Sequence, residues 1–261
     1  MSERTSYEPG TPSWVDLASP DLEASKRFYA GLFGWEAQDA GPVEETGGYA
    51  MFTLNGRNVA GLAAVQDESQ PPAWSTYVAT DDADAAAARV TEAGGNVLFG
   101  PVDVMDAGRV AVFAHPAAGI VGVWQAGSHA GAELVNEHGA LNWNELQTRD
   151  VAGAKAFYAS VFGWRPDEQD FGGMTYTVFN LGDTAIAGAM PMPADVPAEV
   201  PAFWLSYFSV DGCDAAVAKV QELGGSVLGP PHSLEGVGRF AVVADPHGAI
   251  FGVITGEPPE E

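Results

Sequence analysis

Residues 28–35 read FYAGLFGW, and residues 157–164, in the second half of the chain, read FYASVFGW. Apolar residues recur in both stretches at the three- and four-residue spacing of an amphipathic helix. Both stretches close with Gly-Trp, and a glycine at this place is typical of the end of a helix. The duplication predicts that one helix, with one aromatic face, occurs twice in the chain.

The repeat extends outward from these helices in both directions. WVDL at 14–17 corresponds to WNEL at 143–146, and GRVAV at 108–112 corresponds to GRFAV at 238–242. Internal similarity over this length indicates duplicated domains rather than one large domain.

We therefore predict two homologous domains, 1–127 and 140–261. A polar stretch containing glycine, 128–139, is predicted to link them.

Each half divides again into a strand, a helix and three further strands, twice over. Residues 14–18 alternate as the first strand, and Ser19-Pro20-Asp21 supplies a helix N-cap with a proline at the first helical position. Further strands are expected to begin near Trp35, Tyr49, Asn58, Trp74, Val97, Val110, Val121, Asn142 and Phe203. The other helices are expected from Asp82 to Gly94, from Asp150 to Phe162 and from Asp211 to Leu223. The predicted fold class is α+β, with four βαβββ modules paired in tandem.

Composition narrows the classes of partner. The 261 residues include 35 acidic and 11 basic ones, for a formal net charge of −24, which repels nucleic-acid phosphates and anionic membrane surfaces. No apolar run reaches the roughly 18 residues of a membrane span and the start, MSERT, is not that of a signal peptide, so a cytoplasmic protein is expected. The one cysteine, Cys213, lies in an apolar helical pattern and is interpreted as a core residue.

The motifs resemble those of the vicinal-oxygen-chelate superfamily, which includes glyoxalases, bleomycin-resistance proteins and extradiol dioxygenases. The opening strand and helix of that superfamily are matched by Asp16-Leu17, Asp21-Leu22, Phe28-Tyr29 and Phe33-Gly34. Its last turn is matched by Asp245-Pro246-His247-Gly248, where the first half has His115-Pro116-Ala117-Ala118. The resemblance covers nearly the whole chain and implies two glyoxalase-like domains. The layout is similar to a group variously labelled glyoxalase-like, hydroxylase-like or 27 kDa mycobacterial antigen, labels that do not fix a chemistry.

In metal-dependent members of this superfamily, the ligands come from the first and last strands of each module. By register, the corresponding residues here are Trp14, Gly61, Ser75 and Gly122 in the first half and Trp143, Gly188, Leu205 and Gly252 in the second. Indole has no free lone pair on nitrogen, glycine has no side chain and leucine has no heteroatom, so one serine hydroxyl remains. We expect no metal and no other cofactor. In the linker, His129, Glu133 and His138 share no register and are interpreted as solvated.

The same strands predict ligand-binding faces lined by aromatic residues and glycines. Candidate ligand-binding residues are Trp14, Asp16, Ser75, Tyr77, Gly122, Trp124, Trp143, Glu145 and Tyr207. The recurring strand glycines favour close approach of a ligand or of backbone. The alternative is that the aromatic side chains fill the space a metal site would leave. Asp16 and Glu145 are in addition candidates for acid/base catalysis or for structural hydrogen bonds.

Two classes of function fit these features. The first is a metal-independent small-molecule-binding protein of the glyoxalase/bleomycin-resistance type, which binds, sequesters or delivers an aromatic or polyketide-like compound, neutral or cationic, as antibiotic-resistance members do. The alternative is a glyoxalase-like or hydroxylase-like enzyme, a lyase or an oxygenase accessory, which is metal-free or has an atypical metal site. Either a monomer or a homodimer is compatible with four modules.

Overall fold

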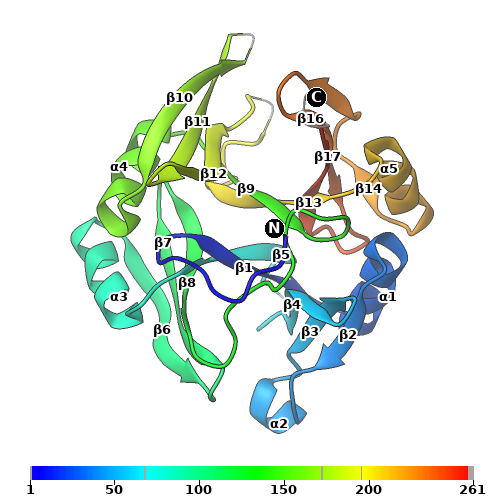
Figure 1. Cartoon of the computed structure of the whole chain (residues 1–261), viewed down its shortest axis with the longest axis horizontal. Coiled ribbons are helices and arrows are strands. Elements are labelled where there is room, and N and C mark those ends of the chain that lie inside the picture. The colour runs from blue at the N-terminus through cyan, green and yellow to red at the C-terminus, as the bar shows by residue number, and fades with distance from the viewer. Residues whose placement is uncertain (1, 68, 172, 195, 258–261) are drawn as a thin grey trace.

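Each half of the chain forms one mixed β-sheet in the computed structural model, which describes residues 2–67, 69–171, 173–194 and 196–257 (Figure 1). The first half contains β1 (Pro12–Ser19), α1 (Leu22–Phe33), β2 (Glu36–Asp39), α2 (Val43–Thr46), β3 (Ala50–Leu54), β4 (Arg57–Ala64), β5 (Ala73–Ala79), α3 (Ala83–Glu92), β6 (Asn96–Val104), β7 (Gly108–His115) and β8 (Gly119–Ala126). The second half contains β9 (Leu141–Thr148), α4 (Val151–Phe162), β10 (Arg165–Phe171), β11 (Met174–Leu181), β12 (Thr184–Pro191), β13 (Phe203–Ser209), α5 (Cys213–Glu222), β14 (Ser226–Val227), β15 (His232–Leu234), β16 (Gly238–Ala244) and β17 (Ile250–Gly256). No helix in the described ranges is long and apolar enough to cross a membrane.

Two βαβββ modules meet at the middle of each sheet through their first strands. The strand order is β2-β3-β4-β1-β5-β8-β7-β6 in the first sheet and β10-β11-β12-β9-β13-β17-β16-β14 in the second, where β15 also pairs with β16. The central pairs β1·β5 and β9·β13 are antiparallel, whereas the last strand of each module pairs in parallel with its first. The predicted α+β fold of four tandem modules is confirmed. The short helix α2 was not predicted.

Aspartate N-caps and glycine ends set the helix limits, as the sequence indicated. The side chains of Asp21, Asp82 and Asp150 each accept a hydrogen bond of 2.8–2.9 Å from the backbone N–H three residues later. Helices α1 and α4 end at Gly34 and Gly163, with φ of 74° and 72°, where a side chain would be strained. The predicted proline at the first helical position is wrong, because Pro20 precedes the capping residue.

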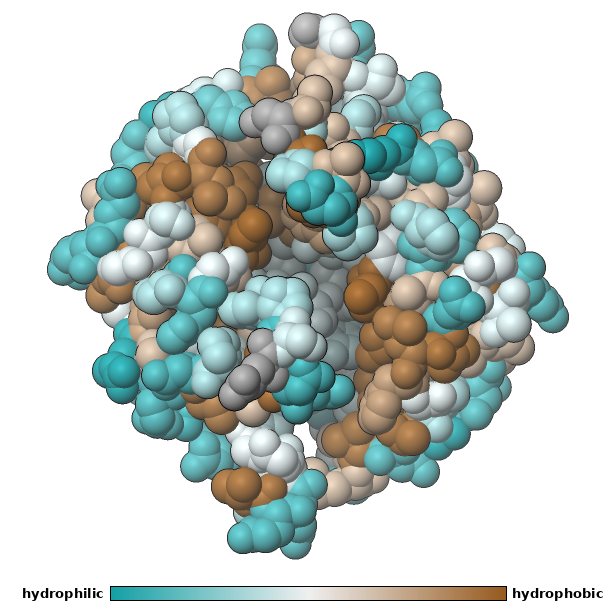
Figure 2. Space-filling view, turned by 180° about the vertical axis from the view of Figure 1, so that it is seen from behind, coloured by the Kyte–Doolittle hydropathy of each residue, from teal (hydrophilic) through white to brown (hydrophobic). Residues whose placement is uncertain are grey.

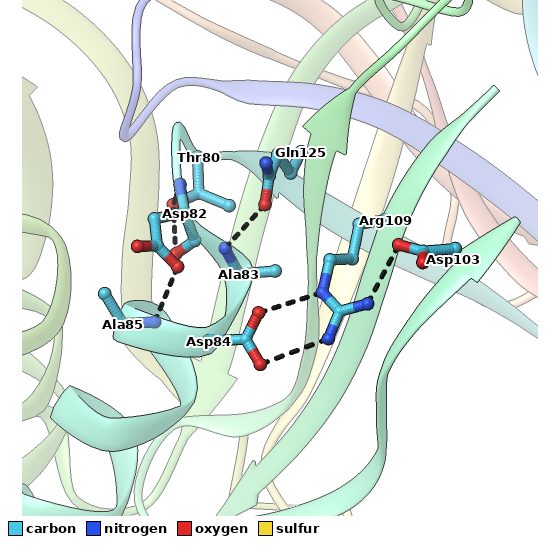
Figure 3. Close-up of polar contacts among 8 residues, drawn as sticks. All are labelled: Thr80, Asp82, Ala83, Asp84, Ala85, Asp103, Arg109 and Gln125. Atoms are coloured by element: carbon cyan, nitrogen blue, oxygen red, sulfur yellow. Dashed lines mark hydrogen bonds and ion pairs between the residues drawn. The ribbon is translucent and has the colours of Figure 1, made fainter. Parts of the chain in front are cut away.

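An arginine in each half connects a helix to the neighbouring strand. Arg109 on β7 donates two hydrogen bonds to Asp84 in the first turn of α3, at 2.9 and 3.1 Å, and one of 2.8 Å to Asp103 on β6 (Figure 3). Arg239 and Asp214 repeat the pair in the second half. The acidic partners are exposed, so each pair contributes at most about 1 kcal/mol to stability. The repeated GR motif therefore marks duplicated architecture rather than a binding site.

Two hydrophobic cores hold the molecule together, and each contains residues from both halves. One joins α1 and its strands to α5, and includes Cys213 as predicted; the other joins α3 and its strands to α4. The two helix pairs lie on opposite sides of the molecule in Figure 1. Buried tryptophans add two hydrogen bonds between distant parts of the chain. The indole of Trp164 donates to the Gly10 carbonyl of the other half at 2.7 Å, and that of Trp35 donates to the Gly139 carbonyl at the end of the linker at 2.6 Å.

Candidate functional site

The helices cover only one face of each sheet, and the candidate site residues lie on the other, which we call the helix-free face. Val15 and Leu17 on β1 point into the core beside α1. Trp14 and Asp16 alternate with them and therefore point to the helix-free face. By the same parity, Ser75 and Tyr77 lie on this face in the first half, and Trp143, Glu145, Leu205 and Tyr207 lie on it in the second.

The strand pairing moves the expected register by two residues. Asp16, not Trp14, lies beside Gly61, and Tyr77, not Ser75, lies beside Gly122. In the second half the glycines Gly188 and Gly252 lie beside Glu145 and Tyr207. A carboxylate and a phenol therefore occupy the centre of each sheet.

Tyrosine rings cover the four recurring glycines. A Cβ added at Gly61 or Gly188 would overlap the hydroxyl of Tyr49 or Tyr176, and a Cβ at Gly122 or Gly252 would overlap the ring of Tyr77 or Tyr207. The group close to each glycine is therefore a tyrosine side chain of the chain itself, and not the ligand or backbone that the strand glycines were predicted to admit. Glycine is needed at each position because a tyrosine lies against the strand.

In the first half, Asp16 lies among hydroxyl groups. The Tyr49 hydroxyl is 3.4 Å from Oδ2 of Asp16 and accepts a 3.0 Å hydrogen bond from the indole of Trp14. Burial raises the pKa of Asp16 to about 6, against the opposing effect of hydrogen bonds from Tyr77, Ser75 and Tyr49. No lysine or arginine in the described part of the chain pairs with Asp16. The residue is nevertheless partly exposed, so a molecule from solvent can reach it.

In the second half, Glu145 has similar partners but is closed off from solvent. Its Oε1 accepts hydrogen bonds from the Gln147 amide at 3.0 Å and from the Tyr207 hydroxyl at 3.3 Å. Trp143 donates to the Tyr176 hydroxyl at 2.8 Å, which repeats the Trp14–Tyr49 pair. Burial raises the pKa of Glu145, and only 7% of the residue is exposed.

The linker lies on the first helix-free face and buries Trp14. Ala132 and Val135 pack against Trp14, which is 4% exposed, and the His129 ring meets it edge-on at 4.5 Å. Backbone hydrogen bonds join Ala132 to the Ser13 carbonyl at 2.8 Å and Glu133 to the Asn58 carbonyl at 2.7 Å. We call residues 128–135 the strap. The interpretation of this segment as a solvated linker is wrong for His129, because the His129 ring packs against the side chain of Trp14.

The two faces differ in which residue is covered, the tryptophan or the acid. On the first face the tryptophan is covered and the acid is partly open. On the second face Trp143 is partly exposed and the acid is covered. Trp14 and Trp143 were both predicted to contact a bound ligand. At Trp14, the strap already covers the side chain.

Exposed apolar residues continue the first helix-free face toward its edge. The cross-strand row runs from Tyr77 through Gly122 and Val112 to Phe99, and Phe99 is exposed. Ile120, two residues before Gly122 and so on the same face, is exposed as well. Figure 2, which views the molecule from behind, shows apolar patches around a hollow, one of them on the side where β6 to β8 lie. The face that contains the partly open Asp16 therefore also has exposed apolar side chains.

Two surface hollows of about 250 and 270 Å³ lie away from these faces. One lies between Pro116 and the segment 198–202, where the guanidinium of Arg149 is held by three backbone carbonyls. The other lies beside His115, whose ring stacks on Phe157 at 4.5 Å.

The donor set does not fit the divalent metal found in related folds. Around each central acid the other donors are tyrosine hydroxyls whose pKa is raised by burial, together with a serine hydroxyl or an amide. A structural or catalytic metal needs three or four protein ligands such as carboxylates, thiolates or neutral imidazoles, and protonated phenols are not among them. Within residues 2–67, 69–171, 173–194 and 196–257, no three His, Cys, Asp or Glu side chains come together in that way.

The structure brings most of the predicted site residues together on their two faces. Asp16, Ser75 and Tyr77 adjoin in the first half and Glu145 and Tyr207 in the second, whereas Gly122 lies under Tyr77. Trp124 holds the strap by donating to the His129 carbonyl at 2.7 Å. Tyr49, Tyr176 and Gln147 were missed. The first two begin the repeated segments YAMF and YTVF, so comparison of the halves at this place would have found them.

Comparison with known proteins supports the resemblance drawn from the motifs. The family profile described as Glyoxalase/Bleomycin resistance protein/Dioxygenase superfamily matches residues 11–121 and 140–253. The chain is 44% identical to "Putative glyoxylase CFP32" of Mycobacterium tuberculosis over 99% of both chains. It is 40% identical to the anthracycline biosynthesis protein DnrV of Streptomyces peucetius, over 96% of this chain and 94% of the other.

Solved structures share the fold at low sequence identity. The Mn(II)-bound glyoxalase from Novosphingobium aromaticivorans has a TM-score of 0.65 at 18% identity, covering 98% of this chain and 83% of that one. The 2,2',3-trihydroxybiphenyl 1,2-dioxygenase of Sphingomonas wittichii has a TM-score of 0.66 at 16% identity, covering 95% and 91%.

Proposed function

The chain belongs to the glyoxalase/bleomycin resistance protein/dioxygenase superfamily, and on that premise we propose that it binds a planar aromatic small molecule on the helix-free face of its first half, without a metal. In this role it sequesters or delivers the compound.

The observation that supports this proposal most strongly is the state of Asp16. A carboxylate in apolar surroundings is costly unless it is paired, and Asp16 has weak hydroxyl partners and no basic one in the described part of the chain. Because the residue is partly exposed, a bound molecule can add a donor to those of the surrounding hydroxyls. The neighbouring apolar wall at Phe99 and Ile120 provides the surface on which a flat ring gains free energy by burial.

The relatives have different names, and one of these names favours the same class of ligand. One is named for anthracycline biosynthesis, and anthracyclines are planar aromatic polyketides. A net charge of −24 also favours neutral or cationic compounds over anionic ones.

Binding can be tested by titrating the protein's tryptophan fluorescence with planar amines, quinones, thiol adducts and aldehydes. We expect saturable binding of a planar donor-bearing compound, weakened roughly tenfold or more in Asp16→Asn, the loss expected for one hydrogen bond to a charged group. Glu44→Gln, an exposed change on α2, is the matched control and leaves binding unchanged. If no member of the panel binds, or if both variants bind as the parent does, the proposal fails.

Independence from metal has its own test. Protein purified without added ions is expected to carry well under one Zn²⁺, Ni²⁺, Fe²⁺ or Mn²⁺ per chain by elemental analysis. A stoichiometric ion that survives dialysis and is lost in Asp16→Asn or Glu145→Gln would overturn this part of the proposal.

One observation favours an enzyme as a second candidate. A partly exposed carboxyl whose pKa is raised to about 6 exchanges protons near neutral pH, as a general base does. Mass spectrometry of any bound compound after incubation tests this. Conversion that is lost in Asp16→Asn while binding persists identifies Asp16 as the acid/base group; an unchanged compound leaves binding as the function.

A further inference from the structure

The edge strands of the two sheets differ in how well they are protected from contact with another chain. An edge strand presents unpaired backbone groups, and natural proteins protect such strands with charged residues, proline or short length. Strand β2 reads EAQD and β10 reads RPDEQDF, so charged residues lie along both. At the outer edge of the second sheet, β14 and β15 have two and three residues and are separated by a segment that contains Gly229-Pro230-Pro231. These edges are therefore poor surfaces for another chain.

Strand β6, the outer strand of the first sheet, is the exception. It is nine residues long and reads NVLFGPVDV, in which Asp103 is the only charged residue. Arg109 on the neighbouring strand donates to Asp103 at 2.8 Å and also pairs with Asp84 (Figure 3). In Figure 1, β6 lies on the rim of the molecule, away from the second sheet. This edge is thus long, mostly apolar and without an unpaired acid of its own.

Large apolar side chains are exposed along β6 and in the turn that follows it. The exposed fractions are 40%, 55%, 50%, 39% and 56% for Val97, Leu98, Phe99, Val102 and Met105, in that order. We call these five residues the edge patch. Together they expose on the order of 400 Å², and an apolar patch of this size is often an interaction site. An apolar area on the β6 side of the molecule is visible in Figure 2.

The irregular backbone of β6 favours a second copy of the chain over an extended peptide as the partner. The pairing of β6 with β7 shifts register between Val97 and Phe99 and again between Phe99 and Val102, and Pro101 has no N–H to donate. A peptide that adds a strand to a sheet depends on a continuous row of backbone hydrogen bonds. A second copy instead brings an identical set of apolar side chains, so its binding depends less on that row.

The size and charge of the edge patch also fit a second copy. Two edge patches in contact bury on the order of 800 Å² of apolar surface, and apolar atoms make up about two thirds of a homodimer interface. The whole contact is then about 1,200 Å², the lower limit for a standard interface. A net charge of −24 repels two copies over most of their surface, whereas the one acid within β6 is paired with Arg109.

We infer that the edge patch is the interface of a homodimer, in which the β6 strands of two copies lie antiparallel across a two-fold axis. Strand β6 is the fourth strand from β1 in the sheet, about 19 Å away at the usual strand spacing, so Asp16 stays open to a ligand. Phe99 lies at the outer border of the helix-free face, which the second copy extends. The dimer does not depend on the binding function proposed above.

A pair of equivalent substitutions tests the inference. VLFGP at 97–101 corresponds to VLGPP at 227–231, and Leu98 and Leu228 are both 55% exposed. Leu98→Lys places a charge in the edge patch, and Leu228→Lys makes the same change of charge outside it. Sedimentation velocity over a range of protein concentrations measures the association of the parent and of both variants. Circular dichroism verifies that the variants are folded.

We expect the parent to dimerise with a dissociation constant on the order of micromolar, because the interface is near the lower size limit. Leu98→Lys should raise this constant at least tenfold, whereas Leu228→Lys should leave it unchanged. Added salt should strengthen the parent dimer, because it screens the repulsion between two acidic chains. Amide hydrogen exchange of the parent needs no substitution, and residues 97–105 should become more protected as the protein concentration rises.

Three results would overturn the inference. The first is a parent that stays monomeric at concentrations far above micromolar, which would leave the edge patch to a different partner. The second is a dimer that Leu98→Lys weakens no more than Leu228→Lys does. The third is concentration-dependent protection that is confined to segments other than 97–105. Ligand binding is measured separately by fluorescence, so none of these results decides the proposed function.

Discussion

At the scale of single residues, the centre of each sheet has a carboxylate surrounded by tyrosine hydroxyls. The tyrosines are themselves oriented, because Trp14 and Trp143 donate to Tyr49 and Tyr176. Burial raises the pKa of these phenols, so they stay protonated and act as donors near neutral pH. An acid held in this way costs folding free energy when it is charged, which is typical of a group kept for binding or chemistry.

Replacing Asp16 by asparagine should stabilise the protein at high pH. Since the pKa of Asp16 in the folded chain, about 6, is above its ordinary value of 3.8, the folded state holds the proton more tightly. The stabilisation this provides is fully present below the ordinary pKa and is lost as pH rises through 6. In urea unfolding we therefore expect Asp16→Asn to gain on the order of 2 kcal/mol at pH 8, allowing for partial exposure, and close to nothing at pH 4. An equal change at both pH values would contradict the raised pKa; Glu44→Gln is again the control.

The two tryptophans of the helix-free faces should respond unequally to truncation. Trp14 is almost fully buried under the strap, so Trp14→Ala should cost about 3 kcal/mol or more of unfolding free energy. Trp143 is partly exposed, and Trp143→Ala should cost roughly half as much. Chemical denaturation of both variants measures the difference, and equal losses would show that the strap does not protect Trp14.

For ligand affinity we likewise expect unequal effects, with Trp14→Ala acting through the strap and Tyr49.

The sequence identified the acids but not all of their partners. Asp16 and Glu145 follow from strand alternation alone, because a period of two needs no distant information. Tyr49 and Gln147 contact those acids from other strands or through a rotamer choice, which depends on sheet register. That register was expected two residues from where it lies, so Trp14 rather than Asp16 was placed beside Gly61.

At the scale of elements, the strap shows how a connecting segment becomes part of a face. Ala132 is 1% exposed, and its N–H and carbonyl are bonded to Ser13 and to the Tyr7 hydroxyl. The whole linker, 128–139, contains polar residues and glycine, so the local pattern predicts a solvated segment. Burial of this segment depends instead on the uncovered Trp14 surface, which only the folded sheet presents.

A charge placed under the strap should release it. Ala132→Asp buries an unpaired carboxylate against Trp14, so we expect a loss of about 2–3 kcal/mol and faster proteolysis within residues 127–139. Ser128→Asp, an exposed change in the same segment, is the control and should leave the cleavage rate unaltered. If both variants are cleaved at the parent rate, the strap is not held by its contacts with Trp14.

Helices and strands themselves were largely predictable. Asp82 and Asp150 as N-caps, and Gly34 and Gly163 as helix ends, are local signals that the structure confirms. The short elements α2 and β14 were less predictable. Helix α2 is a single turn and β14 has two residues, so neither is long enough to show a periodic pattern.

At the scale of the whole molecule, the halves are duplicated in sequence but not independent in packing. Each core combines a module of one half with a module of the other, as α1 with α5 and α3 with α4. Comparison of the sequence with itself reveals the repeat, yet it contains no information on which modules face each other.

Shared cores predict cooperative unfolding. We expect denaturation followed by far-ultraviolet circular dichroism and by tryptophan fluorescence to give one coincident transition, because neither half retains a complete core without the other. Two separated transitions, or a stable intermediate with one half folded, would contradict this. Trp164→Phe, which alters an indole bonded to Gly10 across the boundary, should lower the single midpoint without splitting it.

The central claim concerns where the ligand binds, and a crystal structure of the protein with the planar amine of the panel that binds most tightly tests it most directly. The account predicts that the compound lies on the helix-free face of the first half, with its donor group within hydrogen-bond distance of Asp16 and its ring against the exposed apolar side chains of that face, which include Ile120. A probe bound instead at Trp143 and Glu145, or away from both helix-free faces, would contradict it.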